Sequence, residues 1–151
     1  PRFTDYQSFA EAKLSDIFTE DELKDAKIYQ ATELKTSLFS LNAEGKYESK
    51  PLPSLVQSSP IFAFQIADVN ADGHLDLVMA GNMNHAKLRI GKMDANYGLL
   101  LLGDGHLNFN LVPQRKSGFW LKGDVRSMLK VDDQWFFGIN SLGVESYKLQ
   151  K

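Results

Sequence analysis

The residues best suited to metal chemistry gather in one short stretch, "DVNADGHLD", at positions 68–76. Acids and an amide stand at alternate positions, and Gly73 interrupts the run. In a tightly turning loop such alternate side chains face one point, and glycine permits the sharp bend. The donors are all hard oxygens, three of them carboxylates, which favours Ca²⁺ over Zn²⁺ or Cu²⁺ and suits Mg²⁺ less well. We predict one structural Ca²⁺ site with these ligands: Asp68, Asn70, Asp72, His74 through its backbone carbonyl, and Asp76.

The loop differs from an EF-hand in its last ligand and in its surroundings. An EF-hand needs a bidentate Glu at the twelfth position, where this chain has Met79. The segments "IFAFQIA" before the loop and "LDLVMAG" after it are typical of strands, whereas an EF-hand continues into a helix. The pattern therefore predicts a calcium loop between two strands, and an acidic surface turn that binds nothing is the open alternative.

A second stretch, "GDGHLNF" at positions 103–109, repeats the letters DGHL without the acids. Aligning the two stretches places Leu100 and Leu102 at the first and third ligand positions, and neither side chain can bind a cation. We interpret the second stretch as the glycine turn of a hairpin.

The elements that must position the loop are short. Residues 1–35 predict two short helices with apolar faces, since Ser8 with Glu11 and Thr19 with Glu22 fit the capping box. From position 36 the chain alternates turn residues with runs of β-branched, aromatic and leucine residues. The predicted strands of this antiparallel meander are "SLFSL", "IFAFQIAD", "LDLVMAG", "KLRIGK", "GLLLLG", "FWLKGDV", "WFFGI" and "VESYKL".

An internal repeat divides the remaining chain into residues 36–97 and 98–151. Each half has a strand, a glycine turn, a proline-containing connection, an apolar strand and a last strand that ends in Asn. The spacing of roughly sixty residues is near that of one propeller blade. We align Asp68 with Asp124, which places Arg126 where Asn70 stands and predicts that the second half has lost the calcium site.

The loop with the following "LVMAGN" resembles the calcium loop of FG-GAP or VCBS repeats, the blades of integrin-α-like β-propellers. The segments "LFSLNAEGKYESKPLP", "YGLLLLGDGHLNF" and "SGFWLKGDVRSM" are similar to blade segments of bacterial VCBS-type surface proteins, so the resemblance covers roughly position 36 to the C-terminus. It implies a mostly β fold of about two antiparallel four-stranded blades, a partial propeller, with cation ligands at the same five positions. Since a closed propeller needs four to eight blades, we expect a fragment of a longer protein.

The resemblance further implies a non-enzymatic binding or adhesion module that is extracellular, on the cell surface or periplasmic. Its partner is an unidentified protein or carbohydrate, and its exposed sheet edges offer a route to self-association. An enzyme propeller that acts on glycans and a pure structural spacer are the alternatives. Trp120 and Trp135 are the aromatic residues whose exposure would mark a contact surface.

Composition narrows the remaining classes of function. The net charge of −2 offers no field for nucleic acid, and no apolar run approaches the ~20 residues of a membrane-spanning helix. Cysteine is absent, the three histidines have no zinc-protease spacing, and Asp94 is best explained by a bend. No P-loop, nucleophile elbow or dinucleotide motif is present, so we expect no enzyme.

Overall fold

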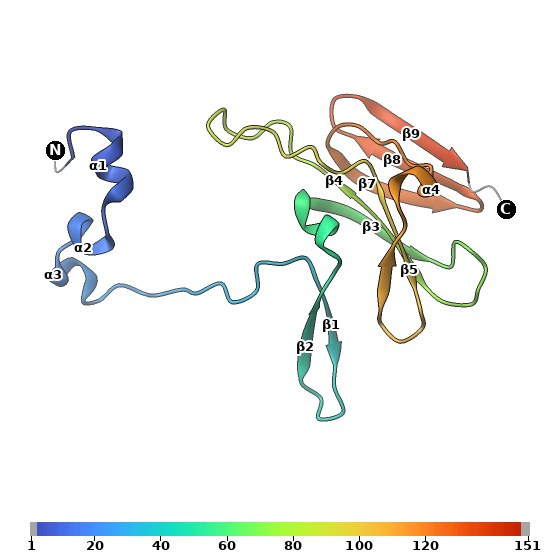
Figure 1. Cartoon of the computed structure of the whole chain (residues 1–151), viewed down its shortest axis with the longest axis horizontal. Helices are drawn as coiled ribbons and strands as arrows, with labels where there is room; N and C mark the ends of the chain where they lie inside the picture. The colour runs from blue at the N-terminus through green and yellow to red at the C-terminus, as the bar shows by residue number, and fades with distance from the viewer. Residues whose placement is uncertain (1–2, 149–151) are drawn as a thin grey trace. The chain divides into compact units, whose positions relative to one another are not determined.

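A computed structural model describes residues 3–148, and the chain divides into two compact units, residues 1–34 and 35–151 (Figure 1). The first unit contains three short helices where we expected two. These are α1 (Tyr6–Glu11), α2 (Leu14–Ile17) and α3 (Glu20–Leu23).

Capping side chains explain where these helices begin. The predicted capping box at α3 is confirmed, because Thr19 Oγ1 accepts from the Glu22 amide at 3.3 Å and Glu22 accepts from the Thr19 amide at 2.8 Å. The predicted box at Ser8 is wrong: Ser8 lies inside α1, and its amide donates to the Asp5 carboxylate at 2.8 Å. A carboxylate at the N-cap accepts a charge-assisted bond, which starts the helix three residues earlier. None of the three helices has a buried residue: Phe9 and Leu14 are exposed, and Ile17 and Leu23 are half-buried, so the apolar faces expected to pack are only partly covered.

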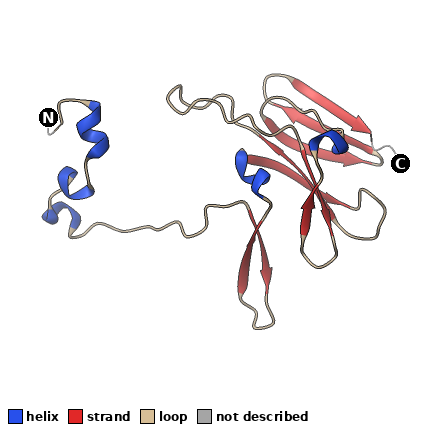
Figure 2. Cartoon of the chain, viewed as in Figure 1, coloured by secondary structure: helices blue, strands red, loops and turns tan. Residues whose placement is uncertain are grey.

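The second unit is mostly β, as predicted, and consists of three antiparallel sheets (Figure 2). They have two, four and three strands, in the orders β1-β2, β3-β4-β5-β6 and β7-β8-β9, where we expected two sheets of four. Both halves of the repeat contribute to the four-stranded sheet. The strands are β1 (Ser37–Leu41), β2 (Tyr47–Pro51), β3 (Ile61–Ala67), β4 (Asp76–Gly81), β5 (Leu99–Gly103), β6 (Phe109–Leu111), β7 (Val125–Val131), β8 (Gln134–Ile139) and β9 (Gly143–Lys148); a 3₁₀ helix η1 (Ser54–Ser58) and helix α4 (Gln114–Ser117) connect them.

Two predicted strands are not strands. Residues 87–92, "KLRIGK", form a turn in a long loop that the Met83–Met93 bridge closes, and Gly91 there has φ +77°. Residues 119–124 are irregular because Phe119 and Leu121 enter the core while Gly123, at φ +94°, turns the chain. In their place the structure has β2, β6 and β7, which sequence reasoning missed.

The β3–β4 and β7–β8 hairpins have matching strand registers. The pairs Ile61↔Gly81 and Ala67↔Asp76 of β3–β4 correspond to Val125↔Ile139 and Val131↔Gln134 of β7–β8. Both hairpins have a bulge after their first pair. The amide of the Asn that follows each hairpin, Asn82 or Asn140, donates to the residue before the first strand.

This register corrects the predicted alignment of Asp68 with Asp124. Asp124 precedes β7 and corresponds to Pro60, which precedes β3. The counterpart of the eight-residue loop 68–75 is the two-residue turn Asp132–Asp133. The β7–β8 connection is therefore too short to form a loop like that at 68–75, and the presence of Arg126 is not the reason.

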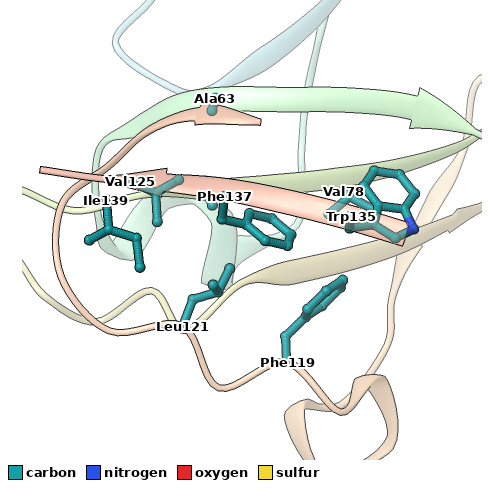
Figure 3. Close-up of a cluster of buried hydrophobic side chains, with 9 residues drawn as sticks. Ala63, Val78, Phe119, Leu121, Val125, Trp135, Phe137 and Ile139 are labelled. Carbon is teal, nitrogen blue, oxygen red and sulfur yellow. The ribbon is translucent and has the colours of Figure 1, made fainter. Parts of the chain in front are cut away.

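Two apolar clusters form the core of the second unit. One joins β3 and β4 to β7 and β8 and includes Val78, Trp135 and Phe137 (Figure 3). The other contains Leu77, Met79 and Leu101, on the opposite face of β4. Every residue of β4 is buried, as expected for a central strand covered on both faces. Asp76 is the first residue of β4, and the apolar run of this strand follows it. The predicted loop is therefore anchored on the most buried strand.

Candidate metal loop

The predicted loop joins β3 to β4, with the pair Ala67↔Asp76 at its base. Asp68 follows the last residue of β3, and Asp76 is the first residue of β4. Two residues take left-handed backbone conformations, Ala71 at φ +60° and Gly73 at φ +86°. This conformation turns the chain sharply, and it comes without strain only for glycine.

Two of the predicted ligands face the same backbone amide. The Asp72 N–H lies 3.2 Å from both Asp68 Oδ1 and Asn70 Oδ1. The other oxygen of Asp68 accepts from the Gly73 amide at 2.9 Å. Because these oxygens share one donor, they lie on the same side of the loop, as the alternating pattern predicts.

The Asp72 carboxylate is held from two directions. Its Oδ1 accepts from the His74 amide at 2.8 Å, and its Oδ2 accepts from the Asn70 side-chain amide at 2.7 Å. These bonds, that from His74 first, lower the pKa of Asp72 below its usual value. The side chain is exposed and ionised at neutral pH, which is the state that a cation requires.

Asp76 differs from the other acids because it is fully buried. Its Oδ2 accepts from the Val69 amide and its Oδ1 from the Gly103 amide, both at 2.9 Å. The carboxylate therefore ties the start of the loop to the end of β5. Both oxygens carry a backbone hydrogen bond, so Asp76 organises the loop whether or not it also contacts a cation.

The second "DGHL" stretch is the β5–β6 turn, as predicted, and it packs against the first. The backbone approach at Gly103 and Gly105 is close: a Cβ on Gly103 would lie 2.2 Å from the Leu75 carbonyl oxygen, and one on Gly105 would lie 2.6 Å from His74 Nδ1. The sequence did not lead us to predict that this turn supports the loop. Gly103 and Gly105, and the DGHL letters that the two stretches share, could have indicated it.

Asp104 organises the β5–β6 turn internally. Its Oδ1 accepts from the amides of His106 at 2.8 Å and Asn108 at 3.1 Å, and its Oδ2 accepts from the Asn108 side chain. These bonds, the Asn108 side chain first, lower the pKa of Asp104 from 3.8 to about 2. Its carboxylate is thus committed to the turn.

The donor chemistry of the loop suits a hard cation, but the carboxylates are not gathered into a finished cage. Within residues 3–148 no group of three or more His, Cys, Asp or Glu side chains is placed to hold a metal ion. The loop oxygens instead accept backbone N–H groups, which orient Asp68 and Asn70 together while Asp76 lies buried at the base. The five predicted ligands therefore remain a prediction.

Asp124, directly before β7, is a buried acid whose hydrogen bonds were not predicted from the sequence. Asp124 is 2% exposed and accepts from the Asn84 amide at 2.7 Å, His85 Nδ1 at 3.3 Å and Arg126 Nη2 at 3.2 Å. Burial raises the pKa of Asp124, but the bonds from Asn84 and His85 and the charge of Arg126 outweigh it and lower the pKa overall. This carboxylate fastens the long loop after β4 to the start of β7.

The two tryptophans have opposite settings. Trp135 is 1% exposed and belongs to the core, so it is not a surface contact residue. Trp120 is 58% exposed and stacks on Tyr97 with ring centroids 4.8 Å apart, beside the ammonium of Lys122. Of the two, only Trp120 has the exposure expected of a partner contact.

Comparison with protein families, curated proteins and solved structures finds no match to this chain. In the described part of the chain, no helix has the length and apolar character needed to cross a membrane.

Proposed function

We propose that the chain is a calcium-stabilised, non-enzymatic binding module of the FG-GAP/VCBS type, part of a β-propeller-like assembly in an extracellular, cell-surface or periplasmic protein. The observation that carries this proposal is the loop between β3 and β4, in which oxygens of Asp68 and Asn70 converge on one amide beside the ionised Asp72. The strand flanks and the left-handed Gly73 are those that such a loop requires.

Calcium would act on the stability of this hairpin. Bound Ca²⁺ supplies positive charge that offsets the repulsion between the exposed carboxylates of Asp68 and Asp72. Asn70 and the His74 carbonyl add neutral oxygens, and Asp76 fixes the base of the loop against β5. A cation that binds only the folded loop stabilises it by about 1.4 kcal/mol when calcium is roughly tenfold above Kd.

The proposed compartment and assembly follow from the same site. Extracellular modules bind Ca²⁺ at about 0.1 to 1 mM, which suits an exterior address. The four-stranded sheet β3–β6 is a consecutive meander, the topology of one propeller blade. The outer strands β6 and β9 and the two-stranded β1–β2 sheet supply edges for further blades or for a second copy of the chain.

Melting curves of two alanine variants, with and without calcium, test the proposal. Asp72→Ala removes an exposed loop carboxylate and should abolish the rise in melting temperature that about 2 mM Ca²⁺ gives the EDTA-stripped protein. Asp104→Ala is the matched control, since it removes an acid from the same DG sequence context but none of the five predicted ligands. It should lower stability and keep the calcium response. Equal loss of response in both variants would refute the assignment of one calcium loop and one turn.

A further inference from the structure

A groove of about 510 Å³ lies beside the calcium loop, between the four-stranded and the three-stranded sheet. Its volume is within the range of pockets that bind ligands, roughly 300 to 1,000 Å³. Apolar side chains dominate its lining, with Asn70 of the loop at one end. The apolar members are Val69, Leu100, Leu102, Val112, Phe119 and Trp135.

The charged side chains that line the groove are both positive. Lys116 and Lys148 both line it, and no Asp or Glu is among its lining residues. Lys148 pairs with Asp133 at 3.1 Å, but both side chains are about half exposed or more, and such pairs contribute little. The ammonium groups therefore remain able to bind an anionic group that enters over the apolar floor.

The strand β9 beside the groove favours a peptide over a compact small molecule. β9 ends the three-stranded sheet, so along the described residues one of its ladder edges has no neighbouring strand. Tyr147 and Lys148 of β9 line the groove. An extended peptide can use such backbone groups while its alternate side chains enter a groove.

We propose that this groove binds an extended peptide segment of a partner protein in which apolar side chains alternate with acidic ones. The apolar side chains lie on the Leu100 and Leu102 floor, and the acidic groups pair with Lys116 and Lys148. The inference deepens the proposed binding function and rests on it, because Asn70 belongs both to the groove lining and to the calcium loop.

The test uses the full chain in Ca²⁺ and a pool of fluorescein-labelled pentapeptides that alternate Leu, Val or Phe with Asp or Glu. Fluorescence anisotropy should show saturable binding. Lys116→Gln combined with Lys148→Gln should weaken it about tenfold or more, because two charge-assisted contacts are lost. Lys46→Gln, an exposed lysine in the β1–β2 turn, is the charge-matched control and should change nothing.

Two further readouts locate the binding. The pool with Asn and Gln in place of the acids should bind about tenfold more weakly. In NMR spectra the peptide should shift the methyl signals of Leu100 and Leu102, which line the groove, and leave the indole signal of Trp120, which does not line it. No saturable binding, equal affinity for the neutral pool, or equal affinity of the double variant overturns the inference.

Melting curves on the same samples separate this inference from the proposed function. A calcium-dependent rise in melting temperature without peptide binding overturns the peptide groove alone. Peptide binding without any calcium response supports the groove and refutes the calcium-stabilised module.

Discussion

At the scale of single residues, hydrogen bonds to carboxylates separate the roles of acids that look alike in sequence. Asp72 and Asp104 both precede a glycine and a histidine, yet Asp72 lies in an open loop and Asp104 in a closed turn. The alternating spacing correctly predicted that Asp68 and Asn70 share a face. It did not predict that Asp76 is buried with both oxygens on backbone amides, because one of the two donors, the Gly103 amide at the end of β5, is distant in sequence.

The pKa of Asp104 provides a prediction at this scale. Its folded pKa of about 2 lies below the ordinary 3.8. Its bonds therefore stabilise the folded state above the unfolded pKa, and this contribution is lost as pH falls from about 4 through about 2. Asn108→Ala, which removes the main cause, should raise the Asp104 pKa toward 3.8, as measured by NMR titration of the carboxyl carbon.

A nearby asparagine serves as the control for that measurement. Asn110 is an exposed residue of β6, and Asn110→Ala should leave the Asp104 midpoint where it is. An unchanged midpoint in Asn108→Ala would show that the turn hydrogen bonds do not set this pKa.

At the scale of elements, apolar and β-branched runs decided which strands the sequence could reveal. They predicted β3, β4, β5 and β8, which contribute buried residues to the core, and also β1 and β9, which have no buried residue. The sequence did not reveal β2, because all its residues are exposed and its pairing with β1 comes from the turn between them. The alignment of the two halves did not predict the matching registers of the β3–β4 and β7–β8 hairpins, because their loops differ in length.

The buried Asn82 is the strongest test of how these elements are joined. Its side chain accepts from Ser59 Oγ at 2.6 Å and from the Asn96 amide at 3.0 Å, and donates to the carbonyls of Asn96 and Gly123 at 2.7 and 3.1 Å. Asn82→Ala would leave these buried groups unpaired at a backbone φ of +88°. We expect it to lower the free energy of unfolding by ~3 kcal/mol in urea denaturation.

The repeat supplies the matched control. Asn140 occupies the equivalent position after β8 but is exposed, so Asn140→Ala should cost about 0.5 kcal/mol or less. Similar losses in both variants would show that the side-chain bonds of Asn82 do not join β4 to the loops around it.

At the scale of the whole molecule, the sequence predicted a mostly β fold with short helices, and the structure confirms it. It did not predict how the strands divide among sheets. A local apolar pattern fixes which face of a strand is buried, whereas strand pairing depends on contacts between distant residues such as those of Asp76 with Gly103. Calcium binding belongs to this scale too, since the cation would tie β3 and β4 beside the turn that joins β5 to β6.

A calorimetric Ca²⁺ titration of the EDTA-stripped chain tests the central claim most directly. The proposed loop predicts one site, with heat that disappears in Asp72→Ala and persists in Asp104→Ala. An absence of heat up to about 2 mM Ca²⁺ would contradict the claim, because extracellular calcium modules bind within that range. The loop between β3 and β4 would then be an acidic surface turn.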